Sequence, residues 1–242
     1  MNKVKIIIGL VYLVILSILI YFLFNYFDFE DITSIKVIHS NQDQLNMLKE
    51  NNLILLISIF FFITVLWVFL LGFGSPVALI GGFIFGKWLG TLILVFGNTI
   101  GGVLLYILAK NFFSEIIQRK FTSRFSKFIK FFNKNEMMYF MFFRFAGGGG
   151  TPFPIQNILP VIFNISIKNY IIATFFGIIP TTFVSVALGS GIENIIDQNT
   201  ELNFLSVFLS PEIYFPIAGF FALLVFAFFI KKFFFKSSSQ SL

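Results

Sequence analysis

Residues 147–154 read Gly147-Gly148-Gly149-Gly150-Thr151-Pro152-Phe153-Pro154 and interrupt an apolar segment that runs from Met137 to Phe163. Glycine has little preference for helical dihedral angles, and proline lacks the backbone N–H that a helix interior needs. An α-helix therefore cannot continue through this stretch. We expect the chain to turn back here, so that residues 137–166 form a helical hairpin.

The composition places this hairpin in a membrane. Of the 242 residues, 57% are hydrophobic and 12% are charged, whereas soluble domains average roughly 45–50% apolar and about 25% charged residues. Long apolar runs occur at Ile6–Phe24, Leu53–Leu71 and Ile213–Ile230, and roughly 20 such residues span a bilayer. The sequence therefore predicts an all-α integral membrane protein with flanking N- and C-terminal transmembrane helices.

A similar break occurs earlier in the chain. Gly74-Ser75-Pro76 lies 76 positions before Gly150-Thr151-Pro152, and each is followed by the rest of a hairpin and one span. Broken backbone at membrane depth is tolerated only where it is buried in protein or lines a water-filled cavity. We therefore predict an inverted repeat of two opposed re-entrant hairpins, each followed by a transmembrane helix, as in many secondary transporters.

The predicted segments follow one another along the chain. An N-terminal transmembrane anchor (1–27) is followed by an extracytoplasmic polar connector (28–52) and a central unit (53–192), and an outer loop, a last transmembrane helix and a basic cytoplasmic tail complete the chain (193–242). Within the central unit we expect a hairpin (53–88), a span (90–109), a cytoplasmic amphipathic helix (111–135), the second hairpin (137–166) and a second span (169–189). The amphipathic helix is indicated by phenylalanines at helical spacing opposite basic residues.

The distribution of charge orients these segments. With Met1 in the cytoplasm and the hairpins entering from opposite sides, most Lys and Arg residues fall in the cytoplasm and most acidic residues outside. Charge does not distinguish the second hairpin from two full crossings, because both return the chain to the same side. The basic residues that give the net charge of +6 lie beside apolar segments. We therefore expect them to flank membrane helices, and we expect no nucleic-acid partner.

The richness in Phe, Ile, Lys and Asn is typical of an AT-rich genome and hints at a bacterium. Together with the charge distribution, it predicts a multi-pass protein of the cell (inner) membrane with cytoplasmic N- and C-termini.

Two groups of motifs resemble a known family. The first half contains Ile80-Gly81-Gly82-Phe83-Ile84-Phe85-Gly86-Lys87-Trp88-Leu89-Gly90-Thr91, continuing through Gly97 and Gly101 to Lys110. The second half contains Phe143-Arg144-Phe145, Pro152-Phe153-Pro154-Ile155-Gln156-Asn157, Thr174 to Gly177, and Pro180. With these motifs, residues 50–192 resemble the DedA superfamily, whose domain is also called SNARE-associated or VTT, and are most similar to its Tvp-type branch.

The resemblance implies opposed re-entrant hairpins and lipid handling as the broad function. Such relatives include eukaryotic lipid scramblases and bacterial carriers proposed to recycle undecaprenyl phosphate. Members with proposed proton coupling carry acids in the first hairpin and a second arginine in the second one. Here neither Asp nor Glu occurs between Glu50 and Glu115 or between Glu136 and Glu193, and glycines occupy the second-arginine position. Carboxylate-based coupling is therefore not expected.

Arg144 is the only charged side chain well inside a predicted hairpin. A charge at this depth costs about 2.5–3.5 kcal/mol on insertion scales and generally faces a cavity or a partner. We hypothesise that its planar guanidinium binds a lipid phosphate. The alternatives are that it caps carbonyls of the broken helix or extends to the cytoplasmic interface.

Other polar residues and glycines of the second hairpin are candidate substrate-binding residues. Each also has a structural interpretation. Gln156, Asn157 and Thr151 would bind a polar headgroup or satisfy the open backbone of the turn. The glycines of residues 147–150 would bring backbone amides to a phosphate, or serve as a hinge or close packing surface. The prolines Pro152 and Pro154 belong to the turn itself, as Gly74, Ser75 and Pro76 do in the first hairpin.

Small and basic residues elsewhere are mainly interpreted as structural. A stripe of glycines indicates close helix packing, and its members are Gly82, Gly86, Gly90, Gly97 and Gly101. Asn98 and Thr99 would bond across helices or line a path. The basic residues Lys120, Arg124, Lys127 and Lys134 would set topology or recruit anionic lipid.

These observations favour a protein that moves a phosphate-bearing lipid between leaflets, as a flippase or scramblase, with membrane lipids, anionic or polyprenyl phosphate among them, as partners. A small-solute or ion transporter and a non-transporting membrane assembly protein are the alternatives. We expect no enzyme, metal or cofactor, because the chain has no cysteine, one histidine (His39) and no intramembrane acid. The oligomeric state is not predicted.

Overall fold

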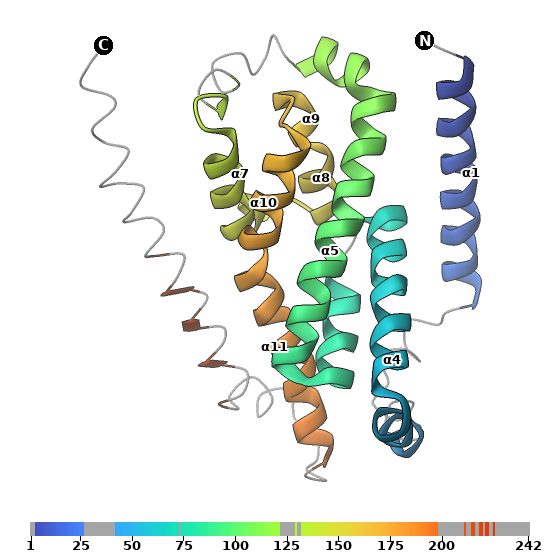
Figure 1. Ribbon diagram of the computed structural model, residues 1–242, viewed down its shortest axis with the longest axis vertical. Coiled ribbons are helices and arrows are strands. Elements are labelled where there is room, and N and C mark those ends of the chain that lie inside the picture. The colour runs from blue at the N-terminus through green and yellow to red at the C-terminus, as the bar shows by residue number, and fades with distance from the viewer. Residues whose placement is uncertain are drawn as a thin grey trace.

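The computed structural model describes residues 3–26, 42–72, 74–121, 129 and 132–197, together with isolated positions between 211 and 225. Within these residues every regular element is a helix and no strand occurs (Figure 1). Most of the predicted last transmembrane helix, the basic tail, and much of the connector and outer loop lie outside the described residues.

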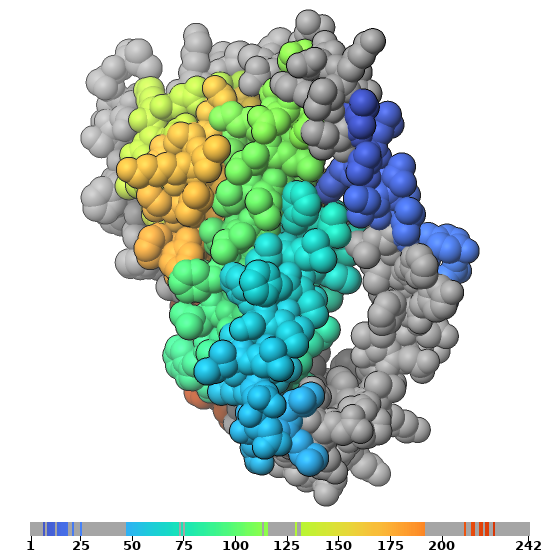
Figure 2. All heavy atoms as spheres, turned by 45° about the vertical axis from the view of Figure 1, so that its right-hand side comes forward, coloured from blue at the N-terminus to red at the C-terminus, as the bar shows by residue number. Residues whose placement is uncertain are grey.

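Several described helices are long and apolar enough to cross a membrane. They are the stretches Met47–Leu71 and Pro76–Phe112, and the bent pair of α10 (Ile167–Gly177) and α11 (Ile179–Asp197) can form a third. The outward side of α4 (Gln42–Leu71) is apolar, with Ile54 and Phe62 mostly exposed, and α4 forms one outer face of the molecule (Figure 2). An apolar surface of this extent suits lipid rather than water. These features confirm the predicted all-α membrane class.

The predicted anchor forms helix α1 (Lys3–Tyr26). Tyr12 of this helix contacts the end of α4, since its hydroxyl donates to the Leu70 carbonyl at 2.9 Å and lies 3.2 Å from the Phe69 carbonyl oxygen. Carbonyls in the last turn of a helix have no partner within that helix. Tyr12 therefore satisfies part of the broken end of α4.

The first predicted break lies between α4 and α5 (Ser75–Phe121). The Gly72 N–H donates to the Val68 carbonyl at 2.9 Å and closes α4, and Gly72 itself has a φ of +73°. Pro76 then takes the second position of α5, where its missing N–H has no helical partner to lose. We call Gly72 and Gly74 the first turn.

Helix α5 consists of two arms, because the backbone reverses at Gly86 (φ 71°, ψ 174°). A Cβ atom at Gly90 would lie 2.7 Å from the Gly81 carbonyl oxygen, so the arms 75–85 and 87–121 pack side by side (Figure 1). Gly86 lies near the predicted boundary between the hairpin 53–88 and the span 90–109, and was also expected to be a packing glycine. The packing expectation is wrong, since nothing lies within 4 Å of its Cβ position and its dihedral angles are open essentially only to glycine.

The second predicted break separates short helices. Helix α7 (Glu136–Phe145) is followed by the turn η1 (Gly147–Gly150), α8 (Phe153–Ile158) and α9 (Pro160–Phe163). All four glycines of η1 have positive φ, from 61° to 79°, a left-handed conformation that other residues rarely adopt. We call residues 147–152 the second turn. In Figure 1, α4 and α7 begin at opposite ends of the molecule and both lead to its middle.

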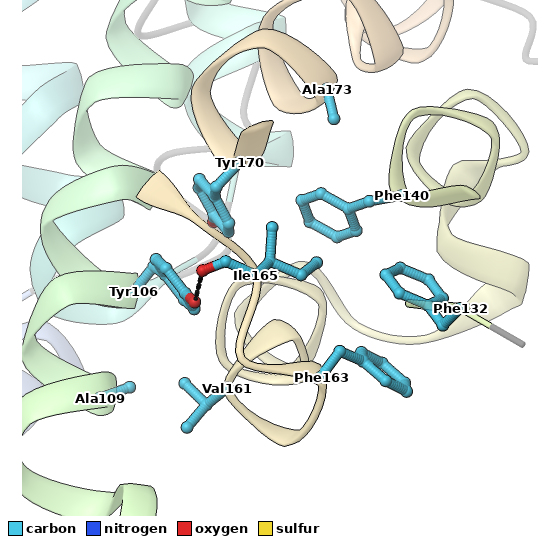
Figure 3. Packing of buried hydrophobic residues seen from close by; sticks show 9 residues of the cluster. All are labelled: Tyr106, Ala109, Phe132, Phe140, Val161, Phe163, Ile165, Tyr170 and Ala173. Carbon is cyan, nitrogen blue, oxygen red and sulfur yellow. Dashed lines mark hydrogen bonds between the residues drawn. The ribbon is translucent and has the colours of Figure 1, made fainter. Parts of the chain in front are cut away.

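The first turn contacts α8 beside the long arm of α5. A Cβ atom at Gly72 would lie 2.8 Å from the Cβ of Pro154, the second residue of α8. The long arm packs against α4, α8, α9, α10 and α11. Its Tyr106 lies in an apolar core with Phe140, Phe163 and Tyr170, and the Tyr106 hydroxyl donates to the Ile165 carbonyl (Figure 3).

Two predicted boundaries differ from the structure. Residues 111–121 continue α5 instead of beginning a separate amphipathic helix, because no glycine or proline interrupts the chain there; residues 122–128 lie outside the described part. The second span is bent by 42° between α10 and α11. Pro180 explains the bend, since it lacks an N–H and its ring clashes with the preceding turn.

The remaining glycines of the predicted packing stripe do lie at close contacts. Cβ atoms at Gly97 and Gly101 would lie 2.8 Å from the Thr64 and Val68 side chains of α4, and one at Gly82 would overlap the Val186 carbonyl of α11. Their missing side chains allow α4, α5 and α11 to approach closely.

Candidate functional site

The predicted site lies where α7 ends. Asn135 caps the start of α7 by accepting a hydrogen bond from the Met138 N–H, and Glu136 accepts from the Ser166 N–H at 3.2 Å and from Asn169 Nδ2 at 2.6 Å. These bonds hold the beginnings of α7 and α10 together. Arg144 follows in the last turn of α7.

The Arg144 guanidinium is sealed inside the protein, with an exposed fraction of 1%. Its Nη1 donates to Gln156 Oε1 at 3.3 Å, and its Nη2 donates to Asn157 Oδ1 at 2.5 Å and to the Tyr170 hydroxyl at 2.9 Å. The side chain therefore neither extends to an interface nor caps backbone carbonyls, the two alternatives that the sequence left open.

Aromatic rings complete the surroundings of this cation. The guanidinium carbon lies 4.9 Å from the ring centre of Phe140, 5.1 Å from that of Phe153 and 5.7 Å from that of Tyr170. Such rings attract a cation through their electron-rich faces. Because residues 137–192 contain no Asp or Glu, this segment stabilises the guanidinium with neutral oxygens and aromatic rings and supplies no opposite charge. The site is thus a buried cation without a carboxylate from its own hairpin.

Tyr170 links Arg144 to the central helix. Its hydroxyl lies 3.1 Å from both the Gly102 carbonyl oxygen and Asn157 Oδ1, and can donate to only one of them. Its ring stacks on Tyr106 with the centres 4.4 Å apart. A Cβ at Gly102 would lie 3.1 Å from Asn157 Oδ1, so a larger residue there would crowd the amide.

Gln156 links Arg144 to the second turn. Its Nε2 donates to the carbonyl oxygens of Gly147 at 3.2 Å and Thr151 at 2.7 Å, while its Oε1 faces the arginine. A Cβ at Gly148 would overlap the Gln156 side chain. The left-handed glycine turn therefore provides both the acceptors and the space for this amide.

The structure brings together only part of the predicted site. Arg144, Gln156 and Asn157 are in contact, whereas the Thr151 hydroxyl donates to the Gly148 carbonyl at 2.6 Å and so stabilises its own turn. Gly149 and Gly150 are exposed on the other side of the turn.

Sequence reasoning missed Tyr170, the aromatic rings around the guanidinium, and Gly177. A Cβ at Gly177 would lie 2.5 Å from Arg144 Cβ, so this glycine lets α10 pack against α7. A tyrosine one helical turn before Thr174 in an otherwise apolar run was the available signal for Tyr170.

Tyr170→Phe tests the network. The variant keeps the ring on Tyr106 but removes one of the two acceptors of Arg144 Nη2, together with the hydroxyl that lies 3.1 Å from the Gly102 carbonyl oxygen of α5, so we expect a loss of about 1–3 kcal/mol in the free energy of unfolding. Thermal unfolding in detergent measures it as a lower midpoint. Tyr214→Phe, at an exposed ring, serves as the control. Equal midpoints for wild type and Tyr170→Phe would show that the hydroxyl does not hold the arginine.

Comparisons with known proteins agree with this arrangement. The sequence model of the VTT domain family matches residues 72–191, which include both turns and the whole arginine network. A curated relative, Transmembrane protein 41 homolog from Dictyostelium discoideum, is 26% identical over 163 residues, covering 63% of this chain and 46% of the relative. The chain thus spans about half the length of that relative. No solved structure gives a significant match.

Proposed function

Since this chain belongs to the DedA superfamily of VTT-domain membrane proteins, we propose that it moves phosphate-bearing lipids between the leaflets of its membrane, as a flippase or scramblase. The proposal concerns the activity and its substrate class.

The proposed topology has two re-entrant hairpins, residues 53–88 and 137–166, that enter from opposite faces of a cell membrane. It is supported by the reversal of the chain at each turn and at Gly86, and by α4 and α7 beginning at opposite ends of the molecule. The charge distribution supports cytoplasmic termini. Opposed broken helices that meet at depth form substrate sites in many transporters.

The observation that carries the functional proposal is the buried Arg144, whose hydrogen-bond partners among the described residues are the neutral side chains of Gln156, Asn157 and Tyr170. A guanidinium binds phosphate oxygens by charge-assisted, bidentate hydrogen bonds, which are roughly twice as strong as neutral ones. A lipid phosphate can therefore replace the amide oxygens of Gln156 and Asn157. In this mechanism the amides hold the guanidinium ready in the closed state and release it when a phosphate arrives.

Substrate entry requires an open state, because the guanidinium is almost completely buried. A ligand shifts a protein towards the state that it binds better. The left-handed glycine turn supports such opening, since Gln156 is its main polar link to the arginine. We propose that movement of residues 147–152 exposes Arg144 to a headgroup.

Reconstitution into liposomes tests the function. Vesicles carrying a trace of acyl-labelled fluorescent phospholipid are treated with dithionite, which bleaches only the probe that reaches the outer leaflet. We expect bleaching to continue well beyond the outer-leaflet half with the folded wild-type protein and to stop there in protein-free vesicles. Bleaching that stops at one half with folded protein would contradict lipid movement and favour a small-solute carrier or an assembly protein.

A further inference from the structure

One face of the long arm of α5 forms a wall that runs from the arginine network to the first turn. Asn98, Gly102 and Tyr106 are four residues apart and therefore lie on the same side of the helix. Gly102 contacts the side chains of Asn157 and Tyr170, and Tyr106 stacks on Tyr170. Asn98, one turn further along, lies beside Gly74, where a Cβ would be 3.5 Å from its Nδ2. This face thus leads from the arginine network to the first turn.

Unpaired polar atoms lie along this face. Asn98 has an exposed fraction of 4%, and its Oδ1 has no hydrogen-bond partner within the described part of the chain. Arg144 Nε and Asn157 Nδ2 are likewise buried without partners there. Trp67 Nε1 also lacks one, but its ring packs in a separate apolar cluster around Phe60. The arginine network therefore presents unused donors at Arg144 and Asn157, and the α5 wall presents an unused acceptor at Asn98, near the first turn.

We propose that the transported headgroup carries a hydrogen-bond donor, a hydroxyl or an amine, next to its phosphate, and that Asn98 Oδ1 accepts a hydrogen bond from that donor. The inference rests on the proposed function and names its substrate class. With the phosphate at Arg144 and Asn157, the donor reaches Asn98 about 6 Å along α5, since four helical residues rise by that amount. Phosphoethanolamine and phosphoglycerol headgroups have this length and a terminal donor. Phosphocholine has the length but no N–H or O–H.

The matching of polarity gives the selectivity its physical basis. A site with a polar group placed for a substrate donor disfavours an analogue that lacks the donor, because the polar group is then left buried and unpaired. A choline headgroup leaves Asn98 Oδ1 buried without a hydrogen-bond donor. Ethanolamine and glycerol headgroups satisfy it with an N–H and an O–H, respectively.

The test compares lipids that differ only in the headgroup. Acyl-labelled fluorescent phosphatidylethanolamine, phosphatidylglycerol and phosphatidylcholine are followed by dithionite bleaching in vesicles of one unlabelled composition. We expect the wild-type protein to move the first two faster than the choline lipid by about fivefold or more, the effect of one hydrogen bond. Equal rates for all three lipids would overturn the inference while leaving lipid movement intact. Failure to move any of them would remove the proposed function and this inference with it.

Variants at neighbouring positions attribute the selectivity to one side chain. Asn98→Leu replaces the amide with an apolar group of similar size, and we expect the ethanolamine-to-choline rate ratio to fall to about one. Thr99→Val is the matched control, because the Thr99 hydroxyl already donates to the Val95 carbonyl at 2.6 Å within α5; its ratio should equal that of wild type. If Asn98→Leu does not fold, Asn98→Ala replaces it in the same assay. A folded Asn98 variant that keeps the wild-type ratio would overturn the assignment to Asn98.

Discussion

Replacing Arg144 with methionine is expected to slow lipid movement strongly. Methionine fills much of the same volume but leaves the oxygens of Gln156 and Asn157 without their donor, and an unpaired buried polar group costs about 1–3 kcal/mol, so the rate is measured on variant protein that elutes as a monodisperse peak. The variant no longer offers a charged donor to a phosphate, and hydrogen bonds to charged groups are worth about 1.5–3 kcal/mol each. We therefore expect the rate of dithionite bleaching beyond the outer-leaflet half to fall by about ten- to a hundredfold.

Two further variants test whether Arg144 binds the lipid phosphate or only stabilises the fold. Arg144→Lys keeps the charge but cannot reach Gln156, Asn157 and Tyr170 together, so we expect an intermediate rate. Lys168→Ala removes an exposed cation from the same half of the chain and should behave as wild type. A folded Arg144→Met protein that moves lipid at the wild-type rate would show that the arginine only holds the fold.

The largest effect on stability is expected where α5 and α11 touch through glycines. Cβ atoms at Gly82 and Gly189 would overlap the backbone carbonyl oxygens of Val186 and Leu79, respectively. Backbone atoms cannot move aside as a flexible side chain can, so the helices would have to separate. We expect Gly82→Ala and Gly189→Ala each to lower the free energy of unfolding by about 3 kcal/mol, seen as a lower thermal midpoint and loss of the monodisperse peak in size-exclusion chromatography.

Gly9→Ala is the matched control for these substitutions. Gly9 also lies within a helix, α1, but nothing lies within 4 Å of its Cβ position. Helix propensity alone makes alanine about 0.8–1.0 kcal/mol more favourable than glycine in a helix interior, so this variant should be at least as stable as wild type. A thermal midpoint of Gly82→Ala as high as that of Gly9→Ala would contradict the close packing of α5 on α11.

Local sequence was sufficient to predict the breaks in the helices. Four glycines and two prolines in residues 147–154 prevent one α-helix from continuing through them, and the structure has a left-handed turn at residues 147–150. The membrane class could be predicted for a similarly local reason, since an apolar run needs no partner in the chain to favour lipid. A break in α5 was likewise expected between the hairpin 53–88 and the span 90–109, and the structure puts the reversal at Gly86.

The composition of the candidate site could be predicted only in part. Arg144 was found because a cation in an apolar run is costly wherever that run folds, and Gln156 and Asn157 because they follow the turn. Tyr170 lies 26 positions beyond Arg144 and Gly102 lies 68 positions before Tyr170. Such contacts depend on which helix faces converge, which the spacing of residues within one segment does not specify.

The sequence by itself thus determined that this protein is helical, belongs in a membrane, breaks at residues 147–154 and carries one arginine in an apolar environment. Each of these follows from the free energy of a side chain or a peptide group in its immediate surroundings. Only the tertiary structure decided that Gln156, Asn157 and Tyr170 hold the guanidinium, and that Asn98 and Thr99 have different surroundings. Those outcomes depend on the close approach of α5, α7 and α10, whose packing brings together groups that are distant along the chain.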